Sequence, residues 1–403
     1  MGEGTAGIEV ETTEPDYVGR AYALGGTSPS LDGEPLEEGG DLSSWAGQRA
    51  SGDLTVDVED SVALAAGVTE RIQERGELAG LAITACQEPS SGHVIVGGAT
   101  GLSESGQLVL SNASTSGAQV TIEVMTSTGL APTTPISSVT VGAGDTETVM
   151  IQAGVLDSRI ALAVRSTGGK VSAHLLTHGV DGIDGTGAAT VSPGAEPATH
   201  LVVPGTDFDS TYGQPRLRVA NPQDEATTVT LSALDSDGLD EIDGSIDVDV
   251  PAGTVLDIPV DSAGSQWGAV VVDATDPVMA GLSVTGEHDI AWFPAVAPTT
   301  TAVAALGQAT YTLSLSAPEG ASVTGTFYDR DGKVIETKDF TVDPTFTEEV
   351  PEGATFVHLE SDDPFHPVLV ATKEIAEDML GIEALPLTVP PSGTAKSDAM
   401  VDN

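Results

Sequence analysis

The sequence predicts an all-β protein made of tandem immunoglobulin-like β-sandwich domains. The first reason is an internal repeat: residues 93–98 (His-Val-Ile-Val-Gly-Gly) resemble 200–205 (His-Leu-Val-Val-Pro-Gly), and 107–113 resemble 216–222. A third, more diverged copy includes residues 312–318 (Thr-Leu-Ser-Leu-Ser-Ala-Pro). Repeats near one hundred residues that consist of short strands are typical of β-sandwich arrays.

Two further observations support the same class. Segments such as Gln119-Val-Thr-Ile-Glu-Val124 alternate apolar and polar residues, so one face of each strand is buried and the other meets water. The 47 glycines and 24 prolines are spread between these segments, where they mark turns.

The predicted organisation has six parts. They are a disordered acidic segment at 1–50, strands that cap the first sandwich at 51–92, sandwich 1 at 93–195, sandwich 2 at 199–298, sandwich 3 at 305–382 and a disordered tail at 383–403. Residues 1–50 are rich in Gly, Glu, Ser and Pro and show neither the helical nor the strand period. Small residues and prolines at 179–199 and 297–307 indicate linkers.

Within these parts, alternation predicts each strand in order. The predicted strands are 54–58, 61–66 and 80–86; then 119–124, 138–141, 147–151, 159–164 and 171–176; then 228–233, 246–250, 255–258, 267–272 and 279–284; and finally 322–327, 338–342, 355–359 and 367–371. Lys373–Leu380 is the best helix candidate, because Ile375, Met379 and Leu380 have helical spacing.

The charge restricts the partners. The chain carries 61 Asp and Glu against 14 Lys and Arg, a formal net charge of -47. Nucleic acid and anionic membrane are therefore excluded as partners, because each phosphate contact would add repulsion. A solvated acidic surface is the simplest interpretation, and a basic protein or divalent cations remain open as partners.

The chain has one cysteine and no membrane-spanning pattern. Cys86 lies at the end of an apolar strand beside Gln87-Glu88, where an acidic neighbour raises a thiol pKa, so we interpret it as a buried small apolar residue. No apolar run approaches the roughly 18 residues of a transmembrane helix. Residues 1–6 lack the charged and apolar regions of a signal peptide.

Candidate metal sites have simpler structural explanations. Asp235-Ser-Asp-Gly238 and Asp329-Arg-Asp-Gly332 resemble calcium loops but lack the distal Glu, and the first repeat has Thr126-Ser-Thr-Gly129 at the same place, so we predict hairpin turns. His174 and His178 would share one strand face, but no zincin Glu follows.

Other motifs also favour structural roles. His93 and His200 occupy equivalent repeat positions, which predicts a hydrogen bond where each domain begins. Gly168-Gly-Lys170 lacks the rest of a phosphate loop, and Asn112-Ala-Ser114 is a glycosylation sequon at the asparagine position of the repeat. No Gly-x-Ser-x-Gly motif occurs. We therefore predict no catalytic, cofactor-binding or metal-binding residue.

Several of these motifs resemble a known family. The residues are Cys86-Gln-Glu-Pro89, Val94-Ile-Val-Gly-Gly98, Leu108-Val-Leu-Ser-Asn112 and Ala291-Trp-Phe-Pro-Ala295, and the similarity spans about residues 50–375. The chain resembles an uncharacterised family of secreted or membrane-anchored actinobacterial proteins. The resemblance implies an extracytoplasmic β-sandwich array behind an N-terminal membrane segment, often encoded near a membrane glycosyltransferase. His93-Val-Ile replaces an aromatic pair of the family, and the N-terminal anchor is absent, so we expect the native gene to encode more protein before Met1.

These observations lead to one functional hypothesis and two alternatives. We predict a non-catalytic extracytoplasmic scaffold or accessory protein of the cell envelope, with a protein partner for which a membrane glycosyltransferase is one candidate. A carbohydrate-binding or adhesive module is the alternative, which would need exposed aromatics such as Tyr212 and Trp292, whereas aromatics are 4% of the chain. An enzyme that uses scattered carboxylates is the third hypothesis, with no positioned base or nucleophile to support it. We expect binding determinants in the strand-joining loops and between sandwiches.

Overall fold

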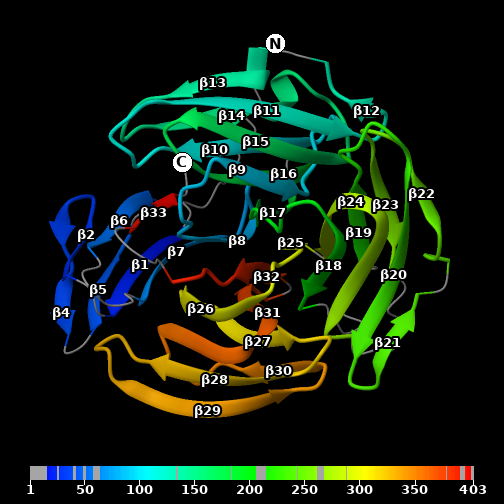
Figure 1. Cartoon of the computed structure of the whole chain (residues 1–403). Helices are drawn as coiled ribbons and strands as arrows, with labels where there is room; N and C mark the ends of the chain where they lie inside the picture. Colours follow the sequence, from blue (N-terminus) through cyan, green and yellow to red (C-terminus); the bar gives the residue numbers. More distant parts are fainter. Residues whose placement is uncertain are drawn as a thin grey trace, which may run out of the picture.

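Four β-sandwiches stand around one central axis (Figure 1). The computed structural model describes residues 16–24, 27–39, 42–48, 51–57, 64–132, 135–182, 184–205, 215–242, 244–260, 267–286, 288–377, 379–390 and 395–400. Within them the regular elements are strands and two single-turn 3₁₀ helices, which confirms the all-β class. The predicted count of three immunoglobulin-like domains is not confirmed, because the strands before residue 92 form a further sandwich.

The N-terminal sandwich packs the sheet β4-β5-β1-β7-β8 against the sheet β3-β2-β6-β33. Its strands are β1 (Asp16–Leu24), β2 (Thr27–Leu31), β3 (Glu34–Pro35), β4 (Glu37–Gly39), β5 (Leu42–Gly47), β6 (Ser51–Asp57), β7 (Leu64–Gln73), β8 (Gly80–Ala85) and β33 (Ala395–Met400). Small side chains, including those of Ala21, Ala65 and Cys86, fill the space between the sheets.

Three sequence predictions are therefore wrong in this sandwich. Strands β1 to β5 lie between residues 16 and 47, where we predicted disorder, and β6 to β8 belong to their own sandwich and do not cap sandwich 1. The tail is also ordered in part, because β33 pairs antiparallel with β6. A local sequence pattern cannot show a strand whose partner lies more than three hundred residues away, since the stabilising pairing is not local.

Sandwich 1 has the sheets β12-β11-β15-β9, with β13 beside β11, and β14-β10-β16-β17. Its elements are β9 (Gly92–Val96), β10 (Glu104–Ser111), β11 (Ala118–Thr126), β12 (Gly129–Leu130), η1 (Pro135–Ser137), β13 (Ser138–Val141), β14 (Thr146–Met150), η2 (Ile151–Ala153), β15 (Ile160–Gly168), β16 (Ser172–Asp181) and β17 (Asp184–Val191). In β11, residues alternate between buried and exposed up to Val124, as the period of two predicts.

Sandwich 2 repeats this strand order, except that one long strand, β24, crosses from the first sheet into the second. Its strands are β18 (Ala198–Pro204), β19 (Arg216–Ala220), β20 (Thr227–Asp235), β21 (Gly238–Glu241), β22 (Val248–Val250), β23 (Val255–Pro259), β24 (Ala269–Thr285) and β25 (Ile290–Pro294). The central part of β24, between the two sheets, is its exposed part.

Sandwich 3 has the same plan, with β31 as its long crossing strand. Its strands are β26 (Thr299–Ala305), β27 (Thr310–Ser316), β28 (Ala321–Tyr328), β29 (Val334–Val342), β30 (Thr345–Glu349), β31 (Phe356–Ala376) and β32 (Met379–Pro386). The predicted helix at Lys373–Leu380 is wrong, because residues 373–376 belong to β31 and residues 379–380 to β32, and these two strands pair as an antiparallel hairpin. Register with a neighbouring strand overrides helical spacing in a window this short.

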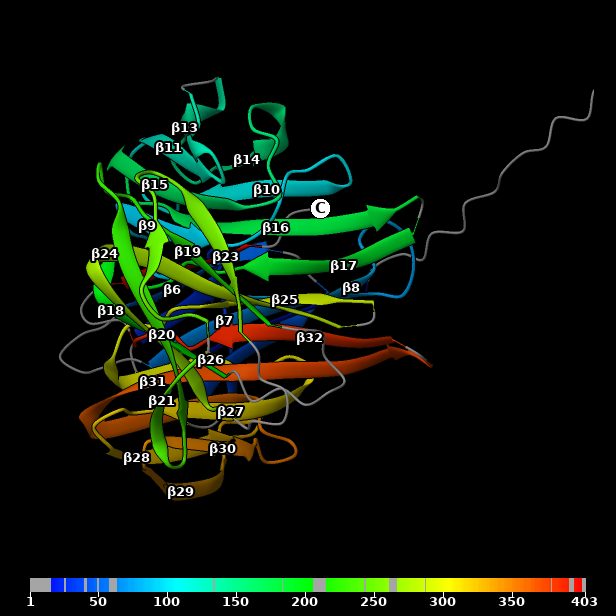
Figure 2. The same ribbon diagram turned by 90° about the vertical axis from the view of Figure 1, so that its right-hand side faces the viewer.

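The last strand of each sandwich lies at the axis. We call β8, β17, β25 and β32 the axial strands; they contact one another in this cyclic order in the middle of the molecule (Figure 1). Each one pairs only with the preceding strand of its own hairpin, namely β7, β16, β24 or β31. Figure 2 shows β17, β25 and β32 running side by side along the axis.

The axial strands also link the hydrophobic cores. Ala291 and Phe293 of β25 lie in the core of sandwich 2, while Ile290 and Trp292 contact the core of sandwich 1. Leu81 and Ile83 of β8 lie likewise in the core of sandwich 3. Because each such strand is buried on both faces, neighbouring sandwiches pack against one another through shared apolar side chains.

Candidate functional site

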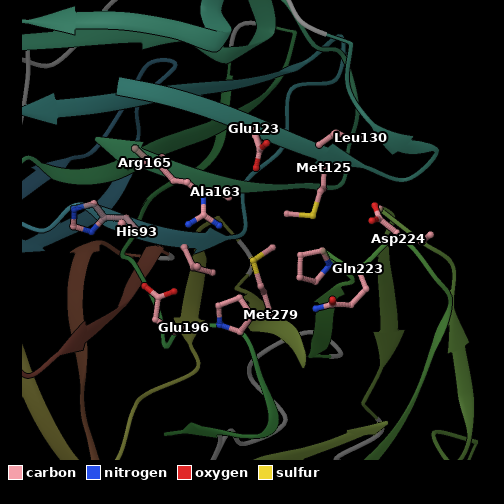
Figure 3. Close-up of a pocket in the computed structure, with 17 residues that line it drawn as sticks. His93, Glu123, Met125, Leu130, Ala163, Arg165, Glu196, Gln223, Asp224 and Met279 are labelled. Atoms are coloured by element: carbon pink, nitrogen blue, oxygen red, sulfur yellow. The ribbon is translucent and has the colours of Figure 1, made fainter. Parts of the chain in front are cut away.

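A groove of about 430 Å³ lies between sandwiches 1 and 2 (Figure 3). Strands β9, β11 and β15 form one side, and the loops that precede β18, follow β19 and precede β23 form the other. A parallel bridge between Thr126 and Thr254 joins the two sandwiches beside it. The groove therefore sits on a fixed junction.

The floor of the groove is apolar. Met125 and Met279 point toward one another from the two sandwiches and belong to a buried cluster with Val94 (Figure 3). Leu130, 58% exposed, and Pro222 present apolar surface at the edge. Because methionine is unbranched and its thioether is polarizable, this floor can adapt to an inserted apolar side chain.

The rim of the groove is mainly acidic. Glu123, Glu196 and Asp224 are exposed around it, and Arg165 is the one cation among its lining residues apart from the titratable His93 (Figure 3). These three carboxylates and one guanidinium give the rim a net negative charge, in keeping with the acidic character of the whole chain. An apolar floor with an acidic rim favours a ligand that carries an apolar side chain next to basic groups.

His93, at one end of the groove, has a structural role. Its Nε2 lies 2.7 Å from the carbonyl oxygen of Val171. Burial lowers the pKa of His93, although this hydrogen bond and the nearby Glu196 oppose the shift. The predicted hydrogen bond is confirmed here, while His200 instead forms an exposed 2.8 Å contact with Asp273.

A buried arginine fixes the same junction behind the groove. The Arg218 guanidinium, 3% exposed, binds both carboxylate oxygens of Asp257 at 2.7 and 3.0 Å. It also donates to the carbonyl oxygens of Gly98, Ser158 and Ile160 in sandwich 1. Since these contacts engage all three guanidinium nitrogens, Arg218 is a structural link and does not offer a free cation.

The remaining sequence candidates lie in structural settings. Both Asp-x-Asp-Gly segments are hairpin turns as predicted, because the first Asp of each accepts a hydrogen bond from the backbone N–H two residues on, at 2.8 Å in one turn and 2.9 Å in the other. Cys86 is buried, as predicted. His174 is buried and His178 half-buried on β16. Among the described residues, no three metal-ligating side chains gather.

Asn112 and Asn221 make the same structural contacts in sandwiches 1 and 2. Each amide nitrogen donates to three backbone carbonyls of neighbouring loops, and each side chain is fully buried. The sequon at Asn112 is therefore closed to a glycan in the folded protein. The repeated asparagine therefore stabilises the turns around it through these hydrogen bonds.

The aromatic residues do not form an exposed platform. Trp292, expected to be exposed, is only 4% exposed and packs under the Arg218 guanidinium at 4.6 Å, so that expectation is wrong. Tyr212 lies outside the described residues. Gly168-Gly-Lys170 ends β15, where Gly168 has a φ of 91°. The methionine pair could not be found from the sequence, because its members lie in separate repeats and meet only through the arrangement of the sandwiches.

Comparisons with known proteins identify the family. Residues 42–352 match the family of unknown function DUF5719, and the chain belongs to this family. No curated protein matches the chain. Among solved structures, Streptomyces avermitilis alpha-L-rhamnosidase complexed with L-rhamnose aligns at 10% identity, over 89% of this chain and 55% of that one, with a TM-score of 0.15. At this score the alignment carries no argument about fold or activity. Within the described residues, the structure has no helix that could span a bilayer.

Proposed function

We propose that this chain is a non-catalytic, extracytoplasmic protein of the cell envelope that holds a partner protein as a scaffold or accessory subunit. The groove between sandwiches 1 and 2 is the binding site in this proposal. Its apolar floor and acidic rim are the observation that carries the proposal. The actinobacterial envelope setting, and a membrane glycosyltransferase as one candidate partner, come from the family resemblance.

The partner segment has a defined chemistry in this proposal. One apolar side chain, such as Leu, Met or Phe, enters between Met125 and Leu130, and neighbouring Lys or Arg residues meet Glu123, Glu196 and Asp224. The described lining of the groove has no Ser, Thr or Cys nucleophile, and its histidine already has a backbone partner, which supports a binding role for this site. The shared strand order of sandwiches 1–3 supports divergent immunoglobulin-like units as the scaffold.

A charge-reversal pair tests the proposal. We expect Glu123→Lys with Asp224→Lys to weaken binding of peptides selected from a 12-residue display library by at least about tenfold at low salt. Leu130→Ala should weaken binding through lost apolar contact, by about 1 kcal/mol, without unfolding the exposed edge. Binding is measured by calorimetry at two salt concentrations, and the wild-type affinity should fall as salt rises.

The matched control is Glu336→Lys with Glu352→Lys on sandwich 3, which changes the net charge equally at exposed positions. These substitutions should leave the affinity nearly unchanged. Equal weakening by both pairs would mean that only the overall charge attracts the peptides, and no weakening by the groove pair would remove the groove as the site.

A further inference from the structure

The axial strands leave backbone donors without strand partners. In a hairpin, alternate N–H groups of the outer strand point away from its partner. The structure shows no ladder between neighbouring axial strands, although they are in contact. The outward N–H groups of Leu81, Ala188, Ile290 and Ile382 therefore face the axis, one from each sandwich. Buried donors of this kind need an acceptor.

One carboxyl group supplies that acceptor. Asp289, fully buried just before β25, accepts hydrogen bonds from Leu81 at 3.2 Å, Ala188 at 3.3 Å and Ile382 at 3.0 Å. It also accepts one from its own neighbour Ile290. A single side chain thus links the N-terminal sandwich and sandwiches 1, 2 and 3.

The equivalent position in the other three strands is glycine, and the geometry explains why. A β-carbon at Gly80 would lie 2.6 Å from Oδ1 of Asp289, and one at Gly187 would lie 2.7 Å from the nitrogen of Ile290. At Gly381 it would lie 2.6 Å from the β-carbon of Leu81. The axis therefore has room for one side chain in this layer, and that side chain is an acid.

A second layer follows the same rule. Glu383 of β32 is fully buried and accepts hydrogen bonds from Thr190 at 2.8 Å, from Ala384 at 3.1 Å and from Ile83. The equivalent residues of the other axial strands are all alanine and all buried: Ala82, Ala189 and Ala291. Each layer thus combines three small residues with one carboxyl group.

We infer that the ring axis is an internal binding site for a carboxyl group, occupied by the side chain of Asp289 and, one layer along, by that of Glu383, and that this pair joins the four sandwiches in a proton-dependent way. The neighbouring elements present backbone N–H groups and small side chains to Asp289. Glu383 is the titratable group that faces Asp289; burial raises the pKa of Glu383, and the charge of Asp289 raises it further.

The proton dependence has a definite sign. Burial raises the pKa of Asp289 to about 7, although four backbone hydrogen bonds oppose the shift, and burial also raises the pKa of Glu383. A carboxyl group with a raised pKa in the folded state stabilises the fold fully below its unfolded pKa, and this contribution is lost as the pH rises through its folded pKa. For Asp289, the loss falls between about pH 4 and pH 7.

Removal of the carboxyl group of Asp289 tests the inference. Asp289→Gly leaves the backbone donors around an empty site, so formate, which supplies a small carboxyl group, should raise the melting temperature of this variant, and more at pH 5.5 than at pH 8.5, because the buried site favours the protonated carboxyl group. The effect of formamide, which has no carboxyl proton, should be the same at both pH values. Val149→Ala, a cavity variant in sandwich 1 away from the axis, is the control and should respond equally to both additives. The same response to formate in both variants, or no selective response in Asp289→Gly, would overturn the inference.

Asp289→Asn keeps the shape of the side chain and provides a second test if Asp289→Gly does not fold. From pH 5.5 to 8.5, the unfolding constant of the wild type should rise about thirtyfold relative to that of Asp289→Asn. Amide exchange at Leu81, Ala188 and Ile382 should be faster in the variant than in the wild type. Parallel pH profiles together with unchanged exchange at these amides would overturn the inference.

Discussion

At the residue scale, the fold depends on a few polar side chains that join sandwiches. Arg218 binds Asp257 within sandwich 2 and three carbonyl oxygens of sandwich 1. Arg20 of the N-terminal sandwich donates similarly to the carbonyl oxygen of Leu306 in sandwich 3, at 2.9 Å. Each arginine lies on the third strand of its sheet, counted from the axial strand, and reaches the turn after the first strand of the preceding sandwich in the ring.

Arg218→Ala should destabilise the protein by about 3–5 kcal/mol, because it leaves Asp257 and several carbonyl oxygens without their donor. Arg218→Lys should recover only part of this loss, since a lysine cannot form the two-pronged contact with Asp257. Urea unfolding measures both variants against Arg330→Ala, whose side chain is 82% exposed and should change stability by less than about 0.5 kcal/mol. A loss at Arg218 no larger than at Arg330 would refute its structural role.

At the scale of elements, β33 closes the ring. The first and last described strands, β1 and β33, both belong to the N-terminal sandwich, since β33 pairs with β6 over six residue pairs, from Ala395 with Val56 to Met400 with Ser51. Removal of β33 exposes the edge of β6, and exposed edges promote association between chains.

A chain that ends at residue 394 should therefore melt at a lower temperature and form soluble oligomers, as measured by calorimetry and light scattering. A chain that ends at residue 400 keeps β33 and is the control, which should behave as the full chain does. Identical melting of the chains that end at 394 and 403 would show that β33 does not contribute to closure.

Sequence patterns could predict the elements that depend on local chemistry. The turns at Asp235 and Asp329 follow from backbone preferences of Asp and Gly, and the alternating strands of sandwiches 1–3 follow from burial of one face. The hairpin of β31 and β32, which stands in place of the predicted helix, could not be predicted, because antiparallel pairing between these two strands sets its conformation. The role of Asp289 at the axis could not be predicted either, although the glycines at the equivalent positions, Gly80, Gly187 and Gly381, are visible in the sequence.

At the scale of the whole molecule, the ring joins the four sandwiches into one unit, which supports the proposed role in presenting a surface to a partner. Shared cores, the two arginine links and the axial carboxyl groups hold the sandwiches in fixed positions. A groove between two such sandwiches keeps its shape without a partner, which lowers the entropic loss on binding. The net charge of -47 adds attraction for a basic partner over distances of about one Debye length.

The measurement that tests the proposed function most directly is site-specific photo-cross-linking in cells that produce the protein. A photoreactive phenylalanine analogue replaces either Leu130, at the groove, or Leu239, at a hairpin edge of sandwich 2, and the two positions are matched at 58% and 53% exposure. We expect a discrete adduct with one envelope protein from position 130 only, and its loss when Glu123→Lys and Asp224→Lys are added. Absence of an adduct at position 130, or the same adducts from both positions, would contradict a partner in the groove.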